Sequence, residues 1–315
     1  MRATLAILCS LVAGSAFAQA VVDREPKGVR DANKFMDQTR ARQDLDKAAA
    51  AMLAPKFRQV IAAYHPGGAS DLTATWAEFV TASGTEFVAL QLALPPDSGL
   101  RAAKEYTFFG VVASDDGKEL ATYSETIPVH QSKGDLLVER SLIVPVQKFH
   151  GIFGLANRGE ILGIARVDFD PETIRKDEAG ISRIIASSDV HLMPSAQSPV
   201  EPFAFGGTKV VPKPHHAFRA ADEVWLFTEL RNPKLGDDGA PHVATKVEVD
   251  GPKKLPGHVI PAEASPLKGV PGHYGIGNTI DVSQLVPGDY TLHVTVIDTV
   301  AKQAFKRDAM LRIVE

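Results

Sequence analysis

The chain has 315 residues, with 34 Lys and Arg against 38 Asp and Glu and a formal net charge of −4. This weak acidity excludes nucleic acid and an anionic membrane surface as the main partner, because both attract basic proteins. The single cysteine, Cys9, excludes a fold held together by disulfides, so stability has to come from burial of apolar side chains.

The first residues predict export. Arg2 precedes an apolar run over residues 3–13, which is too short to span a bilayer, and the triplet Ala16-Phe17-Ala18 has the small residues of a cleavage site. We therefore assign residues 1–18 as a signal peptide and place the mature N-terminus at Gln19. No later apolar run predicts an integral membrane span, so a periplasmic or extracellular location is expected.

The segment 19–70 is predicted to be polar, with a helix over about residues 31–53 that is rich in good helix formers. Asp31 is the expected N-cap, and Pro55 is expected to end the helix. The apolar residues of this segment form a patchy stripe. It is read either as a terminal helix that docks loosely or stands as a stalk, or as a partner-binding helix.

A first β domain is predicted over residues 71–193. Its strands alternate in hydropathy, and two pairs of strands flank the turns 114–117 and 157–159, which is typical of β-hairpins. The expected strands are 86–94, 106–113, 119–127, 136–144, 149–155 and 161–169. Because almost no helical pattern lies between them, an antiparallel sandwich is expected.

A second β domain is predicted over residues 208–315, after a linker of Pro and Ser at 194–207. Its first expected strand begins at Thr208, and the others are 224–230, 242–249, 259–260, 280–282, 290–297 and 304–314. Seven short strands in about 110 residues are typical of an immunoglobulin-like domain. The predicted fold is therefore all-β, with two tandem immunoglobulin-like antiparallel β-sandwiches preceded by an N-terminal α-helical segment.

Four segments carry a recurring pattern: Ser187–Leu192, Pro202–Pro214, Glu223–Leu230 with Phe218 before it, and Leu285–Leu292 with Asp298 after it. These segments resemble a family of exported bacterial proteins, often acidobacterial, that carry GWxTD-type or VWFA-related regions beside Ig-like modules. The resemblance covers roughly residues 85 to 315. The Gly-Trp-x-Thr-Asp motif itself does not occur in this chain, so the resemblance implies export and sandwich architecture and carries over no chemistry.

Sequence motifs for catalysis are not found. The chain has no Gly-x-Ser-x-Gly elbow, and the mature chain has no cysteine nucleophile. The glycines of 272–277 lack the spacing and the Lys-Ser/Thr pair of a phosphate-binding loop. We therefore expect a protein that is not an enzyme.

Histidines are frequent in the second half of the chain, and imidazole binds zinc, copper and nickel. Loops at one end of a sandwich can bring distant residues together, so a divalent metal site is one hypothesis. The alternative is a set of solvated loop histidines. The candidate ligands are His215, His216, His242, His258 and His273.

Acidic residues offer a second candidate site, for calcium. Asp168 and Asp170 fall on the same side of a strand, and Glu172 follows them, so their oxygens could converge on a hard cation. The alternative is that they cap a helical turn over Pro171–Lys176, with proline at its first position. The stretch Gly236–Gly239 has the same two readings, as a calcium loop or a plain turn.

Exposed aromatic residues would indicate recognition of a peptide or a sugar. Trp76 and Phe79 lie in the stretch 70–83, where no periodicity is clear, and Tyr274 lies among glycines. These three residues are candidates for a partner-binding or ligand-binding surface. Trp225, in an alternating strand, is expected in a sandwich core instead.

These observations predict an exported, non-catalytic binding or scaffolding protein of the bacterial envelope, whose partner is an envelope protein or a glycan. Contacts are expected through loops at one end of a sandwich or through strand edges. Two alternatives stay open. One is a metal-binding accessory protein or enzyme that uses the second-domain histidines, and the other is a carbohydrate-binding module that uses Tyr274 or Trp76.

Overall fold

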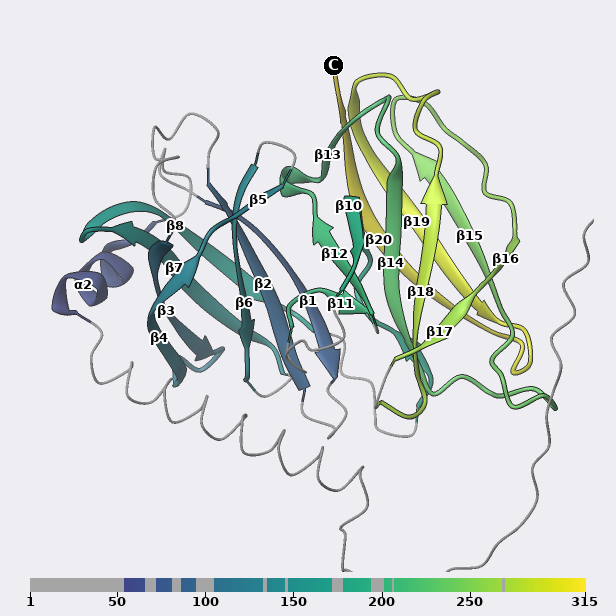
Figure 1. The fold of residues 1–315 in the computed structure, drawn as a ribbon, viewed down its shortest axis with the longest axis horizontal. Helices are drawn as coiled ribbons and strands as arrows, with labels where there is room; N and C mark the ends of the chain where they lie inside the picture. The colour runs from purple at the N-terminus through teal and green to yellow at the C-terminus, as the bar shows by residue number, and fades with distance from the viewer. Residues whose placement is uncertain are drawn as a thin grey trace, which may run out of the picture.

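Four β-sheets lie side by side as four layers (Figure 1). We name them sheets I to IV in the order of the layers, beginning from the sheet next to the helix α2. The computed structural model describes residues 54–65, 72–80, 86–94, 105–132, 135–144, 147–171, 178–193, 201–205, 207–267 and 270–315. The prediction of an all-β fold built from antiparallel sheets is confirmed, while the predicted helix at about 31–53 and the signal peptide lie outside the described residues.

The first sandwich consists of sheets I and II. Sheet II has the strand order β1-β2-β6-β5, and sheet I has the order β4-β3-β7-β8. These are the A-B-E-D and C′-C-F-G orders of immunoglobulin sandwiches. The strands are β1 (Thr73–Val80), β2 (Glu86–Leu94), β3 (Glu105–Ser114), β4 (Glu119–Pro128), β5 (His130–Ser132), β6 (Asp135–Leu142), β7 (Phe149–Asn157) and β8 (Glu160–Phe169).

The second sandwich consists of sheets III and IV, which contain the same A-B-E-D and G-F-C core. Sheet III has the order β11-β12-β10-β14-β18-β17, with β9 also on β14, and sheet IV has the order β13-β20-β19-β15-β16. The elements are β9 (Gly180–Ile181), β10 (Ile185–Leu192), β11 (Ala204–Phe205), β12 (Thr208–Pro212), the 3₁₀ turn η1 (Pro214–His216), β13 (Ala217–Arg219), β14 (Val224–Arg231), β15 (Val243–Asp250), β16 (Ile260–Ala262), β17 (Ala264–Pro266), β18 (His273–Ile280), β19 (Gly288–Asp298) and β20 (Gln303–Val314).

A hydrogen bond at the start of β19 supports the immunoglobulin-like order of the second sandwich. The buried Tyr290 donates its hydroxyl to the carbonyl of Val286, 2.8 Å away. A tyrosine that bonds back to the backbone a few residues upstream, at the corner leading into strand F, is a hallmark of these sandwiches. The bond fixes the corner at which the chain enters the longest hairpin, β19–β20.

Two long strands, β1 and β18, were not predicted from the sequence, and the predicted strand 280–282 is wrong because β18 ends at Ile280. The stretch 70–83, whose hydropathy shows no clear periodicity, contains β1. This strand is buried on both faces at Trp76, Ala77, Glu78 and Phe79. The glycine-rich stretch forms β18, where the ring of Phe227 lies 2.9 Å from the place that a Cβ on Gly277 would occupy. Glycine is uncommon inside strands, so it weakens the prediction of a strand here. Its missing side chain leaves the space at Gly277 that the ring of Phe227 occupies.

The helix α2 (Pro55–Ala63) begins where the sequence prediction had a helix end. Proline fits the first turn of a helix because its missing N–H would have no partner there. Phe57 of α2 stacks on Phe109 of β3, with ring centroids 4.3 Å apart and planes 5° from parallel. The helix thereby covers part of the outer face of sheet I.

The residues predicted as a linker, 194–207, follow a strand that already belongs to the second sandwich. Strands β9 and β10 precede them in the chain, and both pair with β14 of sheet III. The second sandwich therefore includes residues from Gly180 onward. The chain passes between the sandwiches in the connection from β8 to β9.

Each sandwich has a core of its own between its two sheets. The first contains aromatic rings from both sheets, among them Trp76, Phe108, Phe153 and Phe169. The second is mostly aliphatic and includes the buried Tyr290. Burial of these side chains is the main stabilising contribution to each sandwich.

A third core lies between the sandwiches, where sheet II faces sheet III. It joins side chains of β1 and β2 to side chains of β10, β11, β12 and β14 and of the loops before β11 and after β17, and Phe79 is in contact with three other rings. Its ring centroid is 5.5 Å from Phe87, 6.3 Å from Phe203 and 5.3 Å from Phe205. The buried members are Ala77, Phe79, Phe87, Ala89, Ile185, Phe203, Phe205, Val210, Phe227 and Leu267.

An ion pair lies beside this third core. The Nζ atom of Lys209 on β12 lies 2.6 Å from Oε2 of Glu139 on β6 and 2.6 Å from the carbonyl of Pro202. Gln91 donates a hydrogen bond to the other oxygen of Glu139 at 3.2 Å. Because both charges are buried but hydrogen-bonded, the pair fixes how sheet II meets sheet III more than it adds net stability.

The third core makes a prediction about stability. Replacing Phe79 with Ala is expected to lower the free energy of unfolding by about 3–5 kcal/mol, because the ring is fully enclosed between two sheets. Phe79→Leu, which keeps most of the volume, is expected to cost less than about 1.5 kcal/mol. Urea unfolding followed by circular dichroism measures both, and equal costs for the two variants would contradict this assignment.

Candidate functional site

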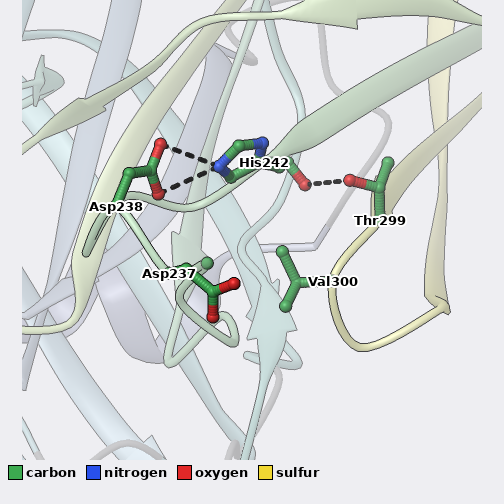
Figure 2. A pocket seen from close by; sticks show the side chains of 6 residues that line it. Asp237, Asp238, His242, Thr299 and Val300 are labelled. Carbon is green, nitrogen blue, oxygen red and sulfur yellow. Dashed lines mark hydrogen bonds and ion pairs between the residues drawn. The ribbon is translucent and has the colours of Figure 1, made fainter.

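An open depression of about 340 Å³ lies at one end of the second sandwich (Figure 2). It forms between the β14–β15 connection and the β19–β20 turn, which correspond to the B–C and F–G loops of an immunoglobulin domain. In variable domains these loops lie at the end that binds antigen. The lining residues are Gly236, Asp237, Asp238, His242, Thr299 and Val300.

The two loops are tied to each other and to the sheet. The carbonyl of His242 accepts hydrogen bonds from the backbone N–H of Thr299 at 2.9 Å and from its hydroxyl at 3.0 Å. The buried carboxylate of Asp298 accepts the backbone N–H groups of Val300 and Lys234. The rim of the depression is therefore held in place by hydrogen bonds to the framework.

A histidine–aspartate pair forms one wall of the depression. The Nε2 atom of His242 lies 3.0 Å from both carboxylate oxygens of Asp238 (Figure 2). The hydrogen bond from His242, assisted by the backbone N–H of Ala240, lowers the pKa of Asp238. The neighbouring Asp237 is exposed and lies apart from this pair, so its carboxylate is available to a partner.

The Gly236–Gly239 stretch is a turn, as one of its two readings predicted. The N–H of Gly239 donates to the carbonyl of Gly236 at 2.9 Å, and the φ angle of Gly239 is 75°. A left-handed backbone conformation of this kind favours glycine.

A second depression, of about 220 Å³, lies beside the β17–β18 turn. His273 lines it, and its Nδ1 atom lies 2.5 Å from Oε1 of Glu229, which is fully buried. Arg231 donates to the other oxygen of Glu229 at 3.2 Å. Tyr274 also lines this depression, where it is half-buried on β18 and not presented on a loop.

The adjacent histidines His215 and His216 lie in η1, close to β1. Both have left-handed backbone angles, with φ of 54° and 51°, and the ring of His215 lies 2.7 Å from the hydroxyl of Thr73. Burial, with smaller contributions from Arg183 and His215, lowers the pKa of His216. Such conformations in non-glycine residues cost energy and tend to occur at functional positions.

The five histidines predicted as metal ligands do not come together. His242 lies at the loop end, His273 beside the β17–β18 turn and His258 on the exposed connection from β15 to β16, while His215 and His216 face β1. Among the described residues, no group of three or more His, Cys, Asp or Glu side chains is arranged to hold a metal ion. The separation arises because the loops leave different ends and edges of the sandwich.

Of the three predicted calcium ligands, the structure describes Asp168 and Asp170. Asp168 is exposed and lies 3.3 Å from Arg166, its neighbour on the same face of β8. Asp170 follows the strand and is exposed. Glu172 lies outside the described residues, so two of the three residues are placed, on one side of the strand end.

Two of the aromatic residues predicted for a binding surface are buried instead, which corrects that expectation. Trp76 packs in the first core at 5.2 Å from Phe169, and Phe79 packs in the third core. They point to opposite faces of β1, and each face is covered by another sheet. Trp225 lies at the margin of the third core, not inside the second sandwich.

Glu78 is a buried residue that the sequence analysis did not single out. It lies on β1, its Oε1 accepts the backbone N–H of Arg183 at 3.0 Å, and its Oε2 is buried without a hydrogen bond among the described residues. Burial raises the pKa of Glu78, and the nearby Arg231 and Arg183 partly oppose that rise. The only sequence signal is a carboxylate within the otherwise uncharged strand Thr73–Val80.

Comparisons with known proteins leave the family open. No protein-family model matches the chain, and no curated protein matches its sequence. The structure of red sea bream transglutaminase is similar over 82% of this chain and 33% of that one, with 11% identity and a TM-score of 0.24. The chain thus spans about a third of the length of that enzyme, and a likeness this low carries no argument about activity. No helix among the described residues is long and apolar enough to cross a membrane.

Glu78 makes the stability depend on pH. Because folding raises its pKa, the folded state holds the proton more tightly, and this contribution is complete below the pKa of an unfolded glutamate. It is lost as the pH rises through the folded pKa. Glu78→Gln keeps an acceptor for Arg183 and does not ionise, so its stability relative to the native protein is expected to increase with pH. Thermal unfolding of both proteins between pH 4 and 8 tests this, and a difference independent of pH would refute it.

The scattered histidines lead to a prediction about metals. A metal bound only by the native state at a hundredfold excess over its dissociation constant would add about 2.7 kcal/mol. Because the described histidines do not converge, EDTA, zinc and calcium are expected to leave the unfolding midpoint unchanged. A shift that EDTA reverses would contradict the separation of the five histidines.

Proposed function

We propose that this protein is an exported, non-catalytic binding or scaffolding protein of the bacterial envelope. The charged and apolar leader ending in Ala16-Phe17-Ala18 supports export. Two sandwiches joined through a buried core support a rigid body that presents its loops in fixed positions. A rigid binding surface loses less conformational entropy when a partner binds.

The observation that carries this proposal is the depression at the B–C and F–G loop end of the second sandwich. Its rim is fixed by hydrogen bonds to the His242 carbonyl and to Asp298, and loops positioned by a rigid scaffold are the usual sites of recognition. Its volume of about 340 Å³ is at the small end of ligand sites, which suits one side chain or one sugar unit of a larger partner.

The chemistry of the rim indicates what kind of partner fits. The carboxylate of Asp237 is exposed, and the Asp238–His242 pair adds further polar atoms. These groups accept hydrogen bonds and favour hydroxyl, amide or cationic donors. An envelope protein or a glycan supplies such donors.

Site-specific cross-linking tests this proposal. A photo-reactive amino acid at Asp237 is expected to give a discrete adduct with an envelope component in cells of the native host. The same amino acid at Met310, which is exposed on sheet IV toward the opposite end of the β19–β20 hairpin, is the matched control and is expected to give none. Adducts of equal yield at both positions, or the absence of adducts at Asp237, would reject the loop end as the binding site.

A further inference from the structure

Strand A of the second sandwich is interrupted where it passes the first sandwich. Strands β9 and β10 pair with the same edge of β14, and Ser182 to Ile184 leave the ladder between them. The backbone of Ser182 still exchanges hydrogen bonds with Glu229 and Thr228. Interruptions of this kind redirect a side chain, and here the redirected residue is Arg183.

Arg183 is held against the first sandwich from two sides. Its guanidinium lies over the ring of Trp76, 3.8 Å from the ring centroid. Its backbone N–H donates to the buried Oε1 of Glu78 at 3.0 Å. Trp76 is itself fixed by Phe169, so the guanidinium rests on a rigid surface at β1, the edge strand of sheet II.

Stacking on one face does not cover the hydrogen-bonding edge of a guanidinium. The N–H groups of arginine lie in the plane of the group, while the stacked ring covers one face. Arg183 is exposed, and none of the described residues accepts a hydrogen bond from its side chain. An oriented guanidinium with open in-plane donors is the arrangement that recognises a planar carboxylate through two parallel hydrogen bonds.

The surrounding charges favour a monovalent anion. The guanidinium of Arg183 lies near two negatively charged residues, Glu78 and Asp170. It also lies near one positively charged residue, Arg307. The guanidinium of Arg307 already donates to the carbonyl of Ile181, so it contributes mainly charge. Because two carboxylates lie near, a dianion such as phosphate is repelled more strongly than a single carboxylate.

We propose that Arg183, supported by Trp76, binds a carboxylate of an acidic peptide at the boundary between the two sandwiches. This site lies on other elements than the B–C and F–G loops, so it is a second binding surface. The acidic peptide bound at Arg183 therefore need not belong to the molecule that binds at the loop end.

Tryptophan fluorescence tests the site directly, because Trp76 supports the arginine. In a Trp225→Phe background, Trp76 is the sole tryptophan. Titration of the purified full chain with the blocked peptide acetyl-Gly-Glu-Gly-amide, which carries one carboxylate, is expected to change its emission saturably. Arg183→Gln and Arg183→Lys are each expected to weaken binding by at least about tenfold, since lysine keeps the charge but loses the planar fork.

Two controls make the outcome decisive. Arg58→Gln changes another exposed arginine, on α2, and is expected to leave peptide binding unchanged. Inorganic phosphate is expected to bind more weakly than the peptide. The proposal is overturned if emission does not saturate, if Arg58→Gln weakens binding as much as Arg183→Gln, or if phosphate binds as tightly. Circular dichroism shows that each variant is folded, and cross-linking at Asp237 reports on the loop end separately.

Discussion

The contact of Phe79 with Phe203 and Phe205 is the interaction on which the arrangement of the whole molecule depends. An immunoglobulin-like sandwich ordinarily exposes the outer faces of both its sheets to water, and those faces are polar. Here sheets II and III carry aromatic and aliphatic side chains on their outer faces, and each covers the other. Separating the sandwiches would expose this third core, so the two sandwiches are stable as one body.

This constraint determines which surfaces remain for recognition. With the faces of sheets II and III covered, partners can reach the loop ends, the outer faces of sheets I and IV and the boundary between the sandwiches. The outer face of sheet IV carries charged cross-strand pairs such as His293 with Asp308, which is typical of a solvated surface. The loop end and the boundary differ from it, because each holds polar groups fixed by buried partners.

Buried charges at the boundary explain why the joint is specific. Lys209 and Glu139 satisfy one another across the layers, whereas Glu78 keeps one oxygen without a hydrogen bond among the described residues. A hydrogen-bonded buried pair costs little and selects one docking geometry. The buried carboxylate of Glu78 destabilises the folded state at neutral pH, because burial disfavours its charged form. Its Oε1 accepts the backbone N–H of Arg183 and so fixes the position of that backbone.

The strands themselves could be predicted from the sequence, because alternation and turn residues are local signals. The strand 86–94 has the bounds that the sequence predicted, and the hairpin with the Ser114–Gly117 turn was also correct. What could not be predicted is which layer covers each face. Trp76 and Phe79 look alike in sequence, yet one packs inside the first sandwich and the other between the sandwiches. The same limit applies to the histidines, since spacing along the chain does not tell which loops share an end.

Differential scanning calorimetry of the full chain tests the joined body most directly. If the third core couples the sandwiches, the protein unfolds in one transition whose calorimetric enthalpy equals its van't Hoff enthalpy. Two separate transitions, each with the enthalpy of a single sandwich, would show that the sandwiches unfold independently and would contradict the account.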